Sequence, residues 1–125
     1  MILDTNAVSA ILAGETAIRP IISAAGSLFL PSIVVGEYRY GLSGSRWEEQ
    51  LTEAFEKLTG TVVVVPVDEA VARQYAVVRR ELRDAGTPIP ENDVWIAACA
   101  MRHEVAILSR DAHFDVVRGI KRIGW

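Results

Sequence analysis

Four acidic residues give this sequence its clearest potential for chemistry: Asp4 in MILDTN, Glu37 in VVGEYRYG, Asp93 in PENDVWIAACA and Asp111 in ILSRDAHFD. Carboxylates are rarely buried unless they are paired or bound to a metal. Two carboxylates about 4 Å apart repel each other by roughly 4 kcal/mol at an effective dielectric constant of about 20. A divalent cation turns such repulsion into binding energy. If these acids converge, they predict a magnesium or manganese site.

The elements expected around the acids would bring them to one edge of a sheet. Asp4 and Asp111 each follow a short apolar run that is typical of a buried strand, and functional groups gather beyond the carboxyl ends of parallel strands. Glu37 and Asp93 lie in segments of helical character, among apolar residues. Each acid also has a simpler interpretation. Asp4 and Asp111 would cap the helical turns that follow them, Glu37 would be a solvated helix residue, and Asp93 would favour the helix dipole.

Strands and helices are expected to alternate along the chain. The expected strands cover residues 1–3, 27–30, 61–67, 105–109 and 121–123, and the expected helical segments cover 7–13, 16–26, 32–42, 46–59, 69–85, 91–102 and 112–117. The valine run in TVVVVPV suits a strand that is covered on both faces, as in a parallel sheet. The alternation predicts an α/β protein with three layers and a central, mostly parallel sheet. We expect residues 1–125 to form a single domain.

Polar residues mark where the helices are expected to begin. Thr5 or Asn6 would cap the first helix, Ser32 the third and Asp68 the fifth. The fourth helix would begin at a capping box, because Ser45 and Glu48 have the required S-x-x-E spacing.

Composition narrows the class of protein. Half of the 125 residues are apolar and 23% are charged, which suits a folded core rather than intrinsic disorder. The longest wholly apolar stretch, residues 94–101, is too short to cross a bilayer, and no secretory signal is visible. The single cysteine, Cys99, is expected to be a buried thiol in a reducing cytoplasm. A formal net charge of −3 is not the signature of a protein that binds nucleic acid by charge alone.

The sequence resembles the PIN domain family, and in particular the VapC-type toxins of bacterial and archaeal toxin–antitoxin pairs. The resemblance rests on ILDTN at the start, the GE of VVGEYRYGL, the NDVWIAACA segment and LSRDAHFD near the end. These pieces occur in the family's order and spacing and span essentially the whole chain. The family's four acids then fall on Asp4, Glu37, Asp93 and Asp111.

The resemblance implies a metal-dependent endoribonuclease that is the toxin of a type II pair. Asp4, Asp93 and Asp111 would be metal ligands, and Glu37 would order or deprotonate the attacking water. Asn6 matches a polar position beside the first acid, and Ser109 stands where the family often has threonine. The resemblance also implies an RNA substrate, a homodimer and a cognate antitoxin that obstructs the acidic pocket.

Two other functions compete with this interpretation. A phosphatase of the haloacid-dehalogenase type would use Asp4 as its nucleophile, but its second aspartate is replaced here by Asn6, and no convincing downstream lysine motif is present. A non-catalytic α/β binding module would have no use for clustered acids. Metal-dependent thermal stabilisation separates this module from the nuclease.

Overall fold

Five short strands form one parallel sheet at the centre of the computed structural model, which describes residues 1–125. The strands are β1 (Ile2–Leu3), β2 (Phe29–Pro31), β3 (Val63–Val65), β4 (Ile107–Leu108) and β5 (Arg122–Ile123). Their order across the sheet is β3-β2-β1-β4-β5, and every neighbouring pair is parallel. Because β1 and β4 are adjacent and in register at Leu3 and Leu108, the residues that follow them leave the sheet side by side.

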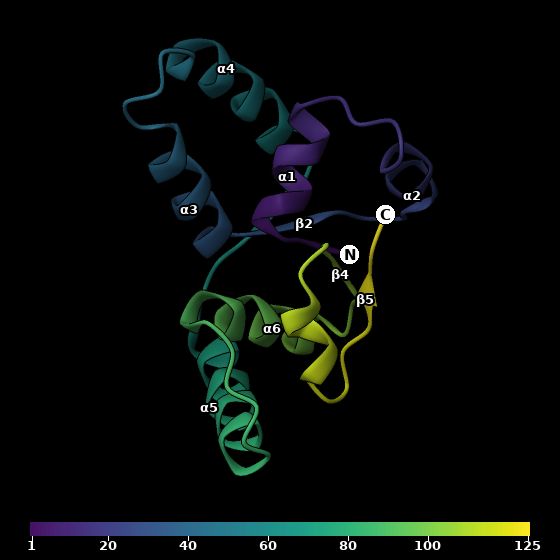
Figure 1. Ribbon diagram of the computed structural model, residues 1–125, viewed down its shortest axis with the longest axis vertical. Helices are drawn as coiled ribbons and strands as arrows, with labels where there is room; N and C mark the ends of the chain where they lie inside the picture. The colour runs from purple at the N-terminus through teal and green to yellow at the C-terminus, as the bar shows by residue number, and fades with distance from the viewer.

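Helices flank this sheet. They are α1 (Thr5–Leu12), α2 (Arg19–Ala24), α3 (Ser32–Leu42), α4 (Glu48–Thr59), α5 (Glu69–Asp84), α6 (Glu91–His103) and the 3-10 turn η1 (Ala112–Val116). Figure 1 shows α1 to α4 on one side of the strands, and α5 and α6 packed together on the other. The predicted three-layer α/β fold with a parallel sheet is confirmed. No helix is both long enough and apolar enough to span a membrane.

Helix α6 is the most deeply buried helix, and it carries one of the four acids. Residues 96–100 are all buried, and most of them are alanine, which lets α6 pack closely against its neighbours. Cys99 is fully buried in this stretch, as expected, and burial raises the pKa of its thiol to about 11. The thiol is therefore neutral and unreactive at ordinary pH.

Three of the four predicted helix caps need correction. Asp4 caps α1 in place of Thr5 or Asn6, because its own side chain accepts a hydrogen bond from the backbone N–H of Thr5. Ser32 is the first residue of α3 rather than its cap, and its hydroxyl accepts from the backbone N–H of Val67. The cap that was predicted correctly is Asp68, whose carboxylate accepts from the N–H of Val71 at 2.9 Å.

The third correction concerns α4, which begins at Glu48 rather than within a capping box. The Ser45 hydroxyl accepts from the backbone N–H of Trp47, and the Glu48 carboxylate accepts from the N–H of Gly44. These two residues therefore close the turn that precedes α4. The second helix, expected from Thr16, begins at Arg19 and has no side-chain cap.

The valine strand is shorter and more exposed than the sequence predicted. Only residues 63–65 of the run form β3, and β3 lies at an edge of the sheet. Val63 and Val64 are 52% and 47% exposed, so the strand is not covered on both faces. The prediction was wrong because continuous valines report β-propensity, whereas the order of strands depends on the whole chain.

Candidate active site

Asp4 stands at the carboxyl end of β1 and is only 5% exposed. One carboxylate oxygen accepts the backbone N–H of Thr5 at 2.7 Å, and the other accepts from Asn6 Nδ2 at 2.6 Å and Ser109 Oγ at 2.7 Å. Burial raises the pKa of Asp4, and the nearby charges of Asp93 and Glu37 raise it further, against the lowering effect of the hydrogen bonds. Capping a helix and belonging to an acidic cluster are therefore compatible roles for this residue.

Ser109 and Asn6 join the ends of the two central strands. Ser109 is completely buried, and its hydroxyl donates to Asp4 while accepting from the backbone N–H of Asp111 at 2.9 Å. Asn6 Nδ2 also reaches Ser109 Oγ at 3.1 Å, and Asn6 Oδ1 accepts from the backbone N–H of Arg110. Both residues predicted to support the acids thus contact Asp4 directly.

Glu37 reaches the cluster from α3. Its Oε2 accepts from Thr5 Oγ1 at 2.5 Å, and its Oε1 accepts from Asn92 Nδ2 at 2.7 Å. These two contacts tie the carboxylate to α1 and to α6. Sequence reasoning gave neither Thr5 nor Asn92 a role at the site, although each lies directly beside one of the predicted acids.

Asp93 and Asp111 meet at the open side of the cluster, where His113 lies between them. His113 Nδ1 is 3.0 Å from Asp93 Oδ2 and 3.0 Å from Asp111 Oδ1. The Asp111 carboxylate also accepts from the backbone N–H of His113, so Asp111 caps η1 as well. His113 is half-exposed, and sequence reasoning gave it no role at the site.

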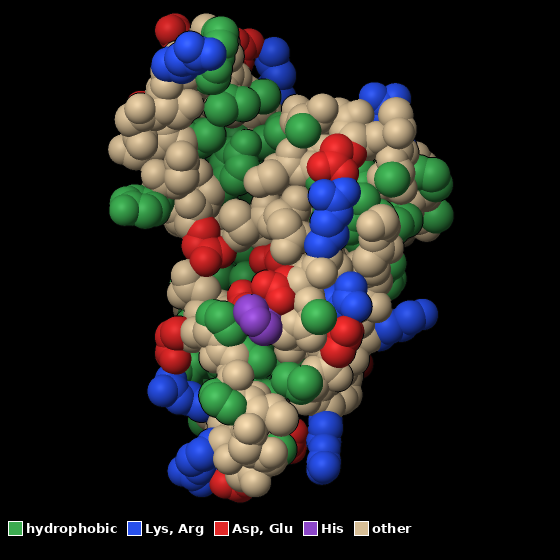
Figure 2. Space-filling view, viewed as in Figure 1, with side chains coloured by type: hydrophobic (Ala, Val, Ile, Leu, Met, Phe, Trp, Pro, Cys, Tyr) green, Lys and Arg blue, Asp and Glu red, His purple; other side chains and the backbone are tan.

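The structure brings the four predicted acids into one network. Asp4 and Asp111 come from the ends of β1 and β4, while Glu37 and Asp93 come from α3 and α6, two helices that contact each other. Figure 2 shows acidic side chains gathered around a single histidine near the middle of one face. Asp115, a further acid two residues beyond His113, lies outside the network, because it forms a two-armed ion pair with Arg122 at 2.7 and 2.8 Å.

The cluster has the donor set and the charge that suit a cation. Ligand atoms of Asp93, Asp111 and His113 all lie within 4.8 Å of one another, and the buried Asp4 is close enough for its charge to interact with that of Asp93. Burial raises the pKa of Asp93, and the charges of Asp111 and Glu37 add to the effect, which the contact with His113 opposes. Two carboxylates and a ring nitrogen thus lie within reach of a single cation.

The apolar side chains of the N-terminal helices contribute to the core. Val8 and Ile18 of the N-terminal segment are fully buried in the core of this chain. The other apolar side chains of that segment are partly buried and pack against the core: Ile11, Leu12, Ile21 and Ile22.

Comparison with known proteins assigns the family. The PIN domain sequence model matches residues 1–120, and the chain belongs to the PIN domain family. The resemblance seen in the sequence is confirmed, and the haloacid-dehalogenase interpretation is excluded.

Within that family the chain is similar to VapC ribonucleases. It is 32% identical to ribonuclease VapC4 of Mycobacterium tuberculosis over 73% of this chain and 72% of the relative. It is 31% identical to VapC ribonuclease Y4jK of Sinorhizobium fredii over 89% of this chain and 86% of the relative. Its fold also matches a chain in the crystal structure of DNA-bound VapBC from Salmonella typhimurium, with a TM-score of 0.90, 25% identity, and coverage of 99% and 96%.

Proposed function

We propose that this protein is a metal-dependent endoribonuclease and the toxin of a type II toxin–antitoxin pair. The observation that carries the proposal is the joint network of Asp4, Glu37, Asp93 and Asp111 in a chain whose relatives are VapC ribonucleases. The VapBC relatives also support a cognate antitoxin as a partner. We further propose a homodimer, a single domain over residues 1–125 and a cytoplasmic location.

The acids divide into two roles in this proposal. Asp93 and Asp111, supported by Asp4, would hold Mg²⁺ or Mn²⁺ through their carboxylate oxygens, which suit both ions. When bound, such a cation polarises a phosphoryl oxygen and lowers the pKa of water. Glu37 is held by Thr5 and Asn92 but keeps acceptor capacity on both oxygens, so it can orient a water and take its proton.

The test is cleavage of total cellular RNA by the purified, antitoxin-free protein, with Mg²⁺ or Mn²⁺ and again with EDTA. Discrete fragments are expected with metal, and they should vanish with EDTA and in the Asp4→Asn and Asp93→Asn variants. Asp115→Asn is the matched control, because Asp115 pairs with Arg122 outside the network and its loss should leave cleavage intact. Undiminished cleavage in Asp93→Asn would contradict the assigned site. Absence of both cleavage and metal-induced stabilisation would favour the binding-module alternative.

A further inference from the structure

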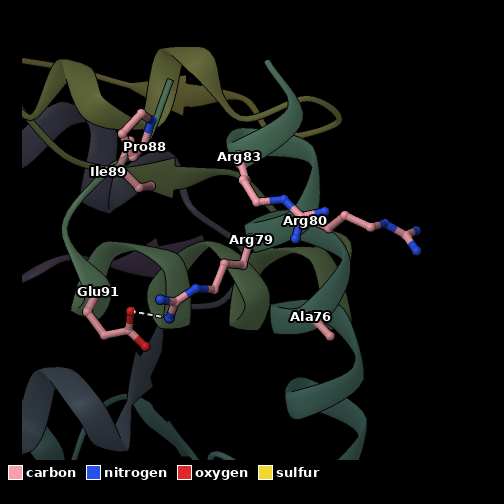
Figure 3. A pocket seen from close by; sticks show the side chains of 7 residues that line it. All are labelled: Ala76, Arg79, Arg80, Arg83, Pro88, Ile89 and Glu91. Atoms are coloured by element: carbon pink, nitrogen blue, oxygen red, sulfur yellow. Dashed lines mark hydrogen bonds and ion pairs between the residues drawn. The ribbon is translucent and has the colours of Figure 1, made fainter. Parts of the chain in front are cut away.

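A basic cleft lies beside the acidic site, between α5 and the loop that leads into α6. Its volume is about 490 Å³, and its lining includes Arg79, Arg80, Arg83, Pro88, Ile89 and Glu91. Figure 3 shows the three arginines coming from α5, with Pro88 and Ile89 on the loop opposite them. The cleft therefore combines guanidinium groups with an apolar wall.

Two of the three guanidinium groups are available to a ligand. Arg79 reaches across the cleft to Glu91 (Figure 3). It also donates to the hydroxyl of Tyr75. Arg80 forms no ion pair, and Arg83 pairs only with its neighbour Asp84, where both side chains are largely exposed. Exposed pairs of this kind contribute little free energy, so a phosphate can replace Asp84 as the partner of Arg83.

The cleft borders the acidic site through the first turn of α6. Glu91 lines the cleft, and the next residue, Asn92, donates a hydrogen bond to Glu37 of the acidic network, so the same turn contributes to both sites. The ring of Tyr75 stacks on that of Trp95 at 3.9 Å, which holds α5 against this part of α6. Figure 2 shows Lys and Arg side chains over the α5 side of the same face that carries the acidic cluster.

We propose that this cleft binds the phosphates of the single-stranded RNA segment next to the scissile bond, an inference that rests on the proposed nuclease function. The protein carries a net charge of −3, and its acidic site repels a polyanion until a cation is bound. A local group of arginines is what attracts RNA to such a surface, because guanidinium groups contact phosphate in a two-armed geometry. Pro88 and Ile89 offer apolar contact to a sugar or base between successive phosphates.

The test is binding of a labelled, mixed-sequence single-stranded RNA to the full-length protein in EDTA, where the strand is not cut. The double variant Arg80→Ala/Arg83→Ala is expected to bind roughly tenfold more weakly at low salt. Its salt dependence should also be shallower, by about 0.7 in the slope of log K against log salt for each phosphate that the variant no longer neutralises. Arg79 is left in place, because its pair with Glu91 supports the turn that carries Asp93.

The matched control is Arg73→Ala/Arg102→Ala, which removes two positive charges from exposed positions outside the cleft. An equal loss of affinity in this control would overturn the cleft as a specific site, as would unchanged RNA binding in Arg80→Ala/Arg83→Ala. Loss of antitoxin binding in that variant, with RNA binding intact, would identify the cleft as a protein interface and also overturn the proposal.

Kinetics separate the cleft from the nuclease function itself. With metal present, Arg80→Ala/Arg83→Ala should raise KM for a cleaved RNA and leave kcat unchanged, because the cleft touches the strand and not the reacting atoms. A lowered kcat with unchanged KM would contradict the role of the cleft in RNA binding. RNA binding through the cleft by a protein that cleaves nothing would instead refute the proposed function and leave the binding site standing.

Discussion

At the scale of single residues, the site depends on neutral side chains that hold the acids in place. Asp4 is held by Ser109 and Asn6, and Glu37 by Thr5 and Asn92. Asp93 and Asp111 lack such uncharged side-chain donors and share only His113. A bound cation would therefore stabilise these two outward-facing acids the most. Asp93 is the more buried of the two.

The first prediction is that Asp93→Asn stabilises the metal-free protein at neutral pH. Because burial and neighbouring acids raise the pKa of Asp93 in the folded state, folding favours its protonated form. This preference stabilises the native state below the ordinary aspartate pKa of about 4. The stabilisation is lost as the pH rises through the raised pKa of Asp93. Asparagine cannot ionise, so in EDTA the melting temperature of the variant should exceed that of the wild type by roughly 3 °C at pH 7.

The pH dependence of this difference is its control. Other carboxyl groups titrate in both proteins, and that of Asp115 titrates in the opposite sense, because Arg122 lowers its pKa. The difference between the two melting temperatures at each pH therefore isolates the contribution of Asp93. The advantage of the variant should vanish near pH 3 and grow as the pH rises. A variant that is less stable than the wild type at pH 7 in EDTA would show that the charge of Asp93 is already compensated.

At the scale of elements, the sequence predicted helix caps and strand ends correctly where a local pattern of residues determines them. Asp68 was a recognisable cap, and the ends of β1 and β4 followed from short apolar runs that stop at polar residues. These strand ends placed Asp4 and Asp111 correctly at one edge. The position of β3 could not be predicted in this way, because an edge strand and a central strand can have the same valine-rich sequence.

The contacts of His113 were missed for a related reason. They depend on η1 turning back toward α6, which no spacing in the sequence encodes. The roles of Thr5 and Asn92 likewise depend on how α1, α3 and α6 meet in space. Local patterns thus identified the acids, whereas the side chains that contact them could be identified only from the packed structure.

The second prediction concerns the end of α6, where Glu104 adopts the left-handed conformation with φ 54°. This conformation costs an ordinary residue about 1–2 kcal/mol, whereas glycine adopts it freely and loses only about 0.5–1 kcal/mol in backbone entropy. Glu104→Gly should therefore raise the free energy of unfolding by roughly 0.5–1 kcal/mol, measured by urea denaturation. Glu104→Ala is the control, because it removes the same side chain and keeps the strain. Equal stability of the two variants would refute the role of backbone strain.

At the scale of the whole molecule, a cluster of acids on one face couples metal binding to folding. The four acids come from four different parts of the chain: the residue after β1, α3, α6 and the segment after β4. A cation that binds them stabilises only the folded chain, because unfolding disperses its ligands. The metal response of global stability therefore tests the site without any knowledge of the RNA substrate.

The third prediction is that Mn²⁺ or Mg²⁺ raises the melting temperature of the wild-type protein. An ion present at a hundredfold excess over its dissociation constant adds about 2.7 kcal/mol, which corresponds to roughly 10 °C for a chain of this size. Asp93→Asn should lose most of this shift, because Asp93 is the more buried of the two outward-facing acids. Asp115→Asn should keep it, because Asp115 is bound to Arg122 instead. An equal shift in both variants would mean that the cation binds elsewhere. No shift in any of the three proteins would mean that Asp93, Asp111 and His113 satisfy one another without an ion.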